Sequence, residues 1–226
     1  MRDKFVIAID GPAASGKSTT ARVLAKEMQY VYIDTGAMYR ACALQALQKN
    51  IELKNIDALE QMLRDICIRI EYSPDGNRIY IDGKDVSERI READITRLAS
   101  EIAVIEIVRL RMVELQREMG KNGGVIMDGR DIGTVVFPDA EFKFFMIADV
   151  KTRAKRRWLE AQAKGEILDL KEVEKELLWR DENDSHRSHS PLKRADDAID
   201  IDTTGLTIEE QTALIRNIIK ARYTDV

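Results

Sequence analysis

The chain has 226 residues, of which 44% are hydrophobic and 34% charged, and its formal net charge is −4. This composition is typical of a soluble globular domain, and the negative balance argues against a nucleic-acid binder that works through bulk charge. No apolar run approaches the ~18 residues that cross a membrane, and the N-terminus enters a strand pattern without a signal peptide. We therefore expect a cytoplasmic protein that binds neither nucleic acid nor a membrane.

The chain has two cysteines, Cys42 and Cys67. Both stand in apolar or helical sequence surroundings, which is typical of reduced core thiols rather than of a disulfide framework. We expect both side chains to be reduced and buried.

The segment from Gly11 to Ser18 follows an apolar strand pattern at residues 4–10 and precedes a helical pattern at 17–28. It matches G-x-x-x-x-G-K-[ST], the loop that cradles nucleotide phosphates. Its glycines let backbone N–H groups converge on phosphate oxygens, and the helix N-terminus adds a favourable field for anions. We expect Lys17 to reach the β- and γ-phosphates and Ser18 to hold Mg²⁺. The alternative is a glycine-rich turn before an ordinary helix.

Strand-like and helix-like segments alternate along most of the chain, which predicts an α/β fold with βαβ units around a parallel sheet flanked by helices. The last helix begins at a capping box, with Thr207 as N-cap and Glu210 three residues later. Further strands are expected at residues 30–33, 125–128, 142–148 and 198–202, and helices at 37–48, 151–164, 170–183 and 207–221.

The middle of the chain departs from this alternation. Apolar and polar residues alternate on both sides of the turn signal Pro74-Asp75-Gly76-Asn77, and a second turn is expected at Asp82-Gly83. Because antiparallel strands do not belong inside a βαβ crossover, residues 51–92 are expected to form an inserted subdomain. Helical periodicity then runs from 93 to 119. The alternating apolar residues are Ile68, Ile70, Tyr72, Ile79 and Ile81.

Charged residues follow the buried strand pattern that ends at Asp128. A carboxylate in this place beside a phosphate loop is typical of a Walker B acid, which holds Mg²⁺ directly or through water. Arg130 suits bidentate pairing with a phosphate, and Asp131 accepts hydrogen bonds from an amine or a hydroxyl. The alternatives are an ordinary strand-end aspartate and a solvated turn with a surface ion pair.

Three further segments carry candidate arginines. Arg40 lies near a helix start, where it suits a second phosphate group, or is a surface arginine behind an N-cap. The basic helix with Arg153, Lys155, Arg156 and Arg157 is either a lid over the transferring phosphoryl group or a solvated helix face. A further set of charged residues recurs at spacings of four and three and therefore lies on one helical face. This face either contacts a ligand or is a salt-bridged helix surface. This set is Arg180, Asp184 and Arg187.

The chain resembles the bacterial cytidylate kinase family of nucleoside monophosphate kinases. The resemblance rests on IAIDGPAASGKSTTA at the start, YIDTGAMYR at 32–40, MDGRDIGTVVFPDA at 127–140, RDENDSHRSHSPL at 180–192 and DIDTTGLTIEE at 200–210. It implies a phosphate-loop NTPase-type parallel sheet, an acceptor-nucleotide subdomain with an antiparallel hairpin, and a helical lid. It also implies ATP-dependent, in-line phosphorylation of CMP and dCMP to CDP and dCDP by a monomer with Mg²⁺.

The resemblance also implies a division of the single domain 1–226 and a set of site residues. The core covers residues 1–50, 93–150 and 185–226, the acceptor insert 51–92 and the lid 151–184. ATP would be bound by Gly11, Pro12, Ala13, Ala14, Ser15, Gly16, Lys17, Ser18 and Thr19, and Mg²⁺ by Ser18 and Asp128. The acceptor base would be contacted by Ser100, Arg109, Asp131 and Arg187, its ribose by Arg180 and Asp184, and its phosphate side by Arg40 and Arg130. Thr35 stands where the family often has Ser, and the catalytic residues would be Lys17, Arg130, Arg153 and Arg157.

Two rival functions remain open at this point. One is another small-molecule kinase with a phosphate loop, of the shikimate or adenylate kinase type. The other is an ATPase or GTPase switch, although the sequence has no N-K-x-D pattern for guanine.

Overall fold

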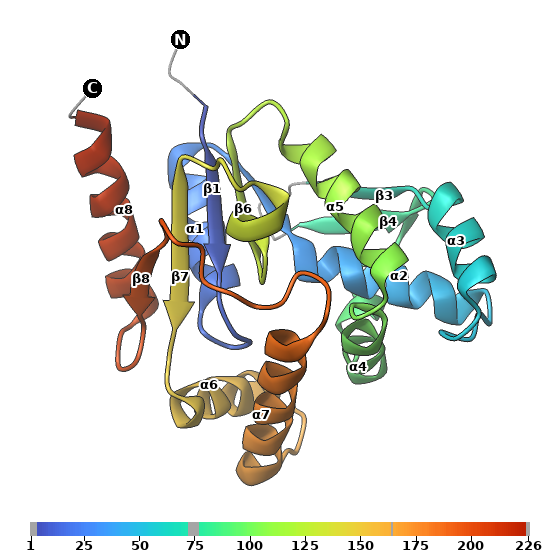
Figure 1. The fold of residues 1–226 in the computed structure, drawn as a ribbon. Coiled ribbons are helices and arrows are strands. Elements are labelled where there is room, and N and C mark those ends of the chain that lie inside the picture. The colour runs from blue at the N-terminus through green and yellow to red at the C-terminus, as the bar shows by residue number, and fades with distance from the viewer. Residues whose placement is uncertain (1–3, 72–76, 164, 225–226) are drawn as a thin grey trace. The chain divides into compact units, whose positions relative to one another are not determined.

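A computed structural model describes residues 4–71, 77–163 and 165–224. The chain divides into two compact units, which we call the first unit (residues 1–30 and 123–226) and the second unit (residues 31–122). Figure 1 shows the elements of both. The predicted turn at Pro74–Gly76 and the predicted strand residue Tyr72 lie outside the described residues.

Parallel strands form the centre of the first unit. β1 (Val6–Asp10) lies between β6 (Val125–Gly129) and β7 (Phe142–Ile147), and β8 (Ile199–Asp202) follows beside β7. β1 and β6 are almost entirely buried, as their continuous apolar runs predict for a parallel sheet covered on both faces. The register pairs Asp10 with Gly129, so the chain segments that follow β1 and β6 leave from the same edge of the sheet.

Helices cover this sheet, and two further helices lie in the region predicted as the lid. α1 (Lys17–Met28) packs against β1, β6 and α8 (Ile208–Thr224), while α6 (Val150–Ala163) packs against α7 (Leu170–His186). Ala154, Val173 and Leu177 of the α6–α7 pair form a small apolar cluster with Ala13 of the phosphate loop. The two helices of the predicted lid are therefore anchored on that loop.

The predicted capping box at the start of α8 is confirmed. The backbone N–H of Glu210 donates to Thr207 Oγ1 at 3.2 Å, and the N–H of Thr207 donates to Glu210 Oε2 at 2.8 Å. Two N–H groups that the helix itself leaves unpaired are thereby satisfied.

The second unit is built around one buried helix. β2 (Val31–Asp34) leads into α2 (Thr35–Gln48), whose residues are buried on almost every side by α3 (Ile56–Asp65), α4 (Ala93–Ile102), α5 (Glu106–Gly120) and β4 (Arg78–Ile81). β3 (Ile68–Glu71), β4 and β5 (Lys84–Asp85) form an antiparallel sheet, and a 3₁₀ turn, η1 (Arg89–Arg91), follows it. The predicted antiparallel hairpin is confirmed, with Ile68 opposite Ile81 and Ile70 opposite Ile79.

Three features of the second unit differ from the sequence-based expectation. The helical run 93–119 is two helices, because Ile105 adopts an extended conformation between α4 and α5. α3 was not predicted, although Asn55 caps it by accepting a hydrogen bond from the N–H of Ala58 at 3.1 Å. Cys67 is exposed rather than buried, because it lies in the short connection between α3 and β3.

Cys42 is buried in α2 as expected, and burial raises the pKa of its thiol to about 12. Both thiols are free. Within the described part of the chain, every helix is too short or too polar to cross a bilayer.

Candidate active site

The phosphate loop connects the end of β1 to α1 and needs glycine at two positions. Gly11 has φ of 145° and Gly16 has φ of 94°, which side chains rarely adopt. A Cβ on Gly11 would lie 2.1 Å from the carbonyl oxygen of Met146, and one on Gly16 would lie 2.8 Å from Gln211 Nε2. The two glycines thus allow the tight curl that brings loop N–H groups together.

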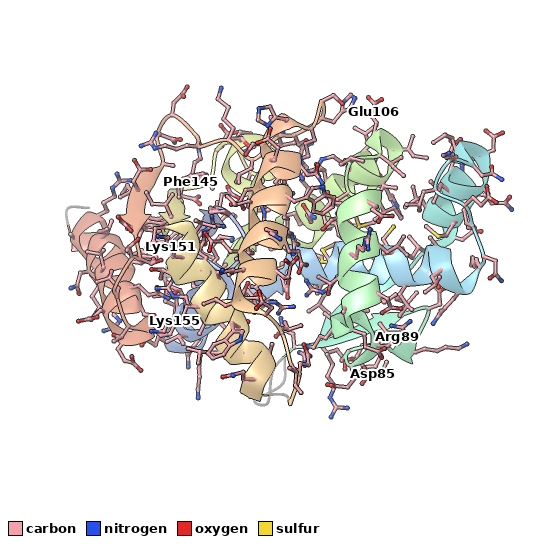
Figure 2. The ribbon with its side chains drawn as sticks, turned by 90° about the horizontal axis from the view of Figure 1, so that it is seen from below. Asp85, Arg89, Glu106, Phe145, Lys151 and Lys155 are labelled. Carbon is pink, nitrogen blue, oxygen red and sulfur yellow. The ribbon has the colours of Figure 1, made fainter. Side chains whose placement is uncertain are left out.

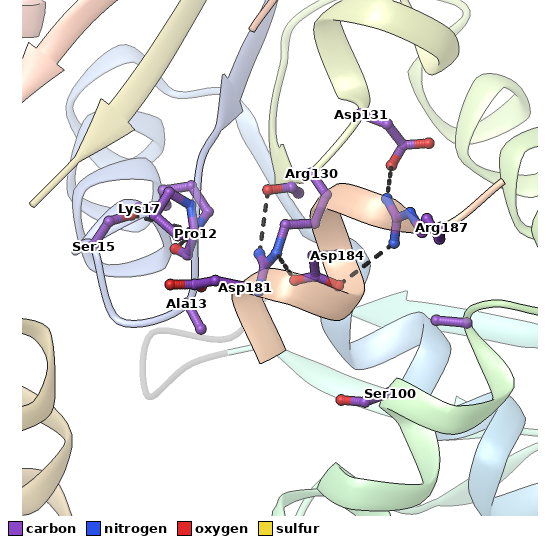
Figure 3. Close-up of polar contacts among 12 residues, drawn as sticks. Pro12, Ala13, Ser15, Lys17, Ser100, Arg130, Asp131, Asp181, Asp184 and Arg187 are labelled. Carbon is purple, nitrogen blue, oxygen red and sulfur yellow. Dashed lines mark hydrogen bonds and ion pairs between the residues drawn. The ribbon is translucent and has the colours of Figure 1, made fainter. Parts of the chain in front are cut away.

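Lys17 is buried at the centre of this loop. Its Nζ donates to the carbonyl oxygen of Pro12 at 2.6 Å and lies 3.4 Å from Ser15 Oγ (Figure 3). Burial and the neighbouring charge of Arg130 lower the pKa of Lys17 to about 7. The loop therefore holds the ammonium group in the space where a nucleotide's phosphates would meet it.

Ser18 and Asp128 bring two oxygen atoms together beside the loop. Ser18 Oγ donates to Asp128 Oδ2 at 2.7 Å. Hydroxyl and carboxylate oxygens are hard ligands of the kind that Mg²⁺ prefers, and Mg²⁺ in such sites completes its shell with phosphate oxygens and water. No cluster of three or more metal-ligating His, Cys, Asp or Glu residues occurs among the described residues. Ser18 and Asp128 therefore fit a metal ion that arrives with a nucleotide.

Charged residues of the Asp128–Asp131 turn meet the predicted polar face of α7. Arg130 Nε donates to Asp184 Oδ2 at 2.6 Å, and Arg187 lies 3.6 Å from Asp184 and 3.7 Å from Asp131 (Figure 3). All four side chains are at least four-fifths buried. Burial alone would raise the pKa of Asp184, but Arg130 and Arg180 outweigh it and lower that pKa.

Arg153 and Arg157, both predicted in the lid, have different surroundings. Arg153 is buried and donates to the carbonyl oxygens of Ala148 at 3.0 Å and Ala13 at 3.2 Å, and to Asp181 Oδ2 at 2.6 Å. Arg157 is 40% exposed and lies 3.7 Å from Glu160. Arg153 thus ties α6 and α7 to the phosphate loop, whereas Arg157 is half open to solvent.

The other basic residues of α6 do not share one environment. Lys151 and Lys155 are exposed on the helix surface (Figure 2). Arg156 instead donates to Thr203 Oγ1 at 3.1 Å and to the Thr203 carbonyl oxygen at 2.6 Å. Thr203 Oγ1 lies 2.9 Å from the carbonyl oxygen of Ser15, to which it donates, so this segment links α6 to the phosphate loop.

Thr35 and Arg40, two of the residues predicted for the acceptor, belong to α2 in the second unit. Thr35 is buried at the first position of the helix. Asp34 caps this helix by accepting from the N–H of Ala37 at 2.8 Å, and its other oxygen accepts from Arg40 at 3.1 Å. The cap therefore also fixes the guanidinium of Arg40.

Ser100 and Arg109 lie on α4 and α5 of the same unit. The guanidinium of Arg109 lies 5.4 Å from the centre of the Tyr39 ring, within the range of a cation–π contact. Arg109 is 2% exposed and also donates to the carbonyl oxygen of Ala103 at 3.1 Å. Ser100 donates weakly, at 3.4 Å, to the carbonyl oxygen of Thr96.

Sequence analysis missed Asp10 as a site residue. Asp10 is buried at the end of β1, where its two carboxylate oxygens accept hydrogen bonds from the backbone N–H groups of Ile132 and Gly133. Burial is the largest cause that raises its pKa to about 7. The available signal was a carboxylate that ends an apolar strand directly before Gly11.

The fold and the site together define a class of protein. A phosphate loop after a central parallel strand, an acid at the end of the neighbouring strand, and arginine-bearing helices anchored on the loop are the parts of a phosphate-loop phosphotransferase. The family model described as "Cytidylate kinase" matches residues 7–221. The chain belongs to the cytidylate kinase family.

Curated relatives agree over nearly the whole chain. The cytidylate kinase of Lactobacillus johnsonii is 50% identical, over 96% of this chain and 94% of its own. That of Enterococcus faecalis is 49% identical, over 97% of each chain. Among solved structures, an uncharacterized protein from Eubacterium ventriosum matches with a TM-score of 0.54 at 15% identity, covering 96% of this chain and 99% of its own. That last likeness concerns the fold alone.

Proposed function

We propose that this protein transfers the γ-phosphoryl group of ATP to CMP and dCMP, giving ADP with CDP or dCDP. Membership of the cytidylate kinase family defines the reaction class. The structural observation that best supports the proposal is the network that joins Arg130 and Asp131, which follow β6, to Asp184 of α7 and Arg187 directly after it. Its buried arginines and carboxylates suit the phosphate, hydroxyl and amine groups of a nucleotide acceptor.

ATP would be bound by the loop residues from Gly11 to Thr19. Their backbone N–H groups and the start of α1 suit the phosphates, and Lys17 would leave Pro12 to meet the β- and γ-oxygens. Ser18 and Asp128 would hold Mg²⁺, which when bound offsets negative charge on the phosphates.

We propose acceptor contacts for residues within each unit. In the first unit we assign Arg130 to the acceptor phosphate, Arg180 and Asp184 to the ribose, and Asp131 and Arg187 to the base. In the second unit we assign Arg40 to the acceptor phosphate side and Ser100 and Arg109 to the base, with Thr35 as a further acceptor contact. In the same proposal residues 51–92 form the acceptor insert, 151–184 the lid, and 1–50, 93–150 and 185–226 the core.

Transfer itself needs no general base. The acceptor phosphate oxygen is an anion near neutral pH, so it attacks the γ-phosphorus in line while the bond to the β-phosphate oxygen breaks. Lys17, Arg130, Arg153 and Arg157 would share the charge that spreads over the transferring group. The lid would exclude water, which prevents wasteful hydrolysis.

We further propose that the protein acts as a cytoplasmic monomer that binds neither nucleic acid nor a membrane. The net charge of −4 supports the absence of a polyanion partner.

An acceptor panel tests this function. Purified protein with ATP and Mg²⁺ is given CMP, dCMP, UMP, AMP or shikimate, and ADP release is followed. CMP and dCMP should be the best acceptors by kcat/KM, and release without any acceptor should be negligible. Preferential phosphorylation of AMP or shikimate, or rapid hydrolysis of ATP alone, would contradict the proposal.

A further inference from the structure

Asp10 joins two segments that are distant in the sequence. Its Oδ1 accepts from the N–H of Ile132 at 2.9 Å, and its Oδ2 accepts from the N–H of Gly133 at 2.7 Å. These two N–H groups open η2 (Ile132–Val136), a short π-helix directly after Asp131. The first N–H groups of a helix have no partner within it, so Asp10 supplies the acceptors that η2 lacks.

The residue in the N-cap position of η2 does not cap it. Asp131 makes no hydrogen bond from its side chain to the start of η2. Its carboxylate instead faces Arg187 at 3.7 Å. Asp10 therefore caps η2 in place of Asp131. The carboxylate of Asp131 can then take part in the charged network with Arg187.

Asp10 is also the residue that precedes the phosphate loop. In the sheet it lies beside Gly129 of β6 and Phe145 of β7, so its backbone is fixed on both sides. The loop has further supports of its own, since Thr203 Oγ1 donates to the Ser15 carbonyl at 2.9 Å and Arg153 donates to the Ala13 carbonyl at 3.2 Å. The turn before η2 thus depends on Asp10 more than the loop does.

We propose that Asp10 is a positioning residue for phosphoryl transfer, which caps η2 from the neighbouring strand and so holds Arg130 and Asp131 in register with the phosphate loop. The proposal rests on the function proposed above, in which Arg130 and Asp131 contact the acceptor. A carboxylate suits the task because both of its oxygens are acceptors.

The electrostatic surroundings agree with this role. Asp10 is buried, and Asp131 repels it while Lys17 attracts it. Burial makes the charged form of Asp10 costly and is the main cause of its raised pKa, and repulsion by Asp131 adds a smaller contribution. Asp10 thus interacts electrostatically both with Lys17 of the phosphate loop and with Asp131 of the turn.

Asp10→Asn tests the proposal. An amide has one acceptor oxygen, so its NH₂ group would face either the Ile132 or the Gly133 N–H and break that bond. We expect KM for CMP to rise about tenfold or more while KM for ATP stays within about twofold. Amide hydrogen exchange of Ile132 and Gly133, measured without substrate, should become faster.

Ile215→Val is the matched control. Ile215 is fully buried in α8 of the same unit and outside the site, so this change lowers stability without touching the turn. It should leave both KM values and the exchange of the two amides unchanged. If a general loss of stability were the cause, Asp10→Asn and Ile215→Val would change the KM values and the amide exchange in the same way.

A second variant keeps the test valid if Asp10→Asn does not fold. Asp10→Glu keeps both acceptor oxygens but adds a methylene, which moves the carboxylate out of line with the N–H groups of Ile132 and Gly133. The same selective rise in KM for CMP is expected. Equal effects on ATP and CMP, or unchanged amide exchange, would overturn the role of Asp10. Failure of the wild-type protein to use CMP would instead overturn the proposed function, and the exchange experiment would still decide whether Asp10 holds the turn.

Discussion

Lys17 Nζ lies 2.6 Å from the carbonyl oxygen of Pro12, so the loop that would bind phosphate holds its own ammonium group in the meantime. Burial and the charge of Arg130 lower the pKa of Lys17 to about 7. The uncharged form of Lys17 is therefore more accessible near neutral pH than that of an ordinary lysine. Arrival of a phosphate chain favours the charged form, because an opposite charge within a few ångströms raises the pKa of an amine.

ATP binding is expected to take up protons because of this change. At about pH 8, which is above the pKa of Lys17 in the protein without ATP, up to one proton should be taken up for each ATP bound. Calorimetry of ATP binding in two buffers of different ionisation enthalpy measures the uptake. Lys17→Met is the control, since it has no ionisable group at this position. If Lys17→Met and the wild type took up equal numbers of protons, groups other than Lys17 would be responsible for the uptake.

Loss of Lys17 should remove activity and leave the fold intact. Lys17→Ala deletes a charge that stabilises the transferring phosphoryl group, and loss of one such group typically lowers kcat about 10²–10³-fold. The measurement is steady-state kinetics with CMP, together with circular dichroism to confirm folding. Lys26→Ala is a suitable control because Lys26 is an exposed lysine on α1, the same helix as Lys17. A folded Lys17→Ala protein with near-normal kcat would refute the catalytic role.

The parts of the site that sequence analysis predicted are those whose pattern is local. Gly11, Lys17 and Ser18 lie within eight residues, so their spacing alone defines the loop. Arg180, Asp184 and Arg187 were placed on one face by helical spacing, and Asp184 and Arg187 indeed lie together in the charged network.

The parts that sequence analysis missed depend on distant partners. Asp10 bonds residues 122 and 123 positions away, which no local spacing reveals. The break between α4 and α5 was missed because Ile102 and Val108, on either side of it, are both buried. Apolar periodicity therefore continues across a break in the helix, and the pattern cannot distinguish one helix from two.

Asp181 should stabilise the protein through Arg153. Asp181 Oδ2 accepts from the buried guanidinium at 2.6 Å, and Asp181→Asn would remove the acceptor's charge from this ion pair and leave the guanidinium with a neutral acceptor. We expect the free energy of unfolding to fall by about 1–3 kcal/mol. KM for ATP should rise as well, because Arg153 also supports the Ala13 carbonyl of the phosphate loop.

Glu172→Gln provides the comparison for Asp181→Asn on the same helix. Glu172 pairs with Lys175 at 2.6 Å, but both side chains are about two-thirds exposed or more. Water screens such a pair, so the change in unfolding free energy should stay within about 0.5 kcal/mol. Urea denaturation of both variants measures the difference, and equal losses would show that Arg153 does not depend on Asp181.

The raised pKa of Asp10 predicts how stability changes with pH. The pKa is about 7 in the folded protein, against 3.8 for an ordinary aspartate, so between these values the folded state binds more protons than the unfolded state. The free energy of unfolding therefore falls as pH rises through this window. Asp10→Asn cannot titrate, and urea denaturation between about pH 5 and pH 8 should show a smaller fall for it than for the wild type. Ile215→Val should shift the whole curve and keep the wild-type slope, because it removes no titratable group. An Asp10→Asn protein that also keeps the wild-type slope would mean that Asp10 is already ionised across this range.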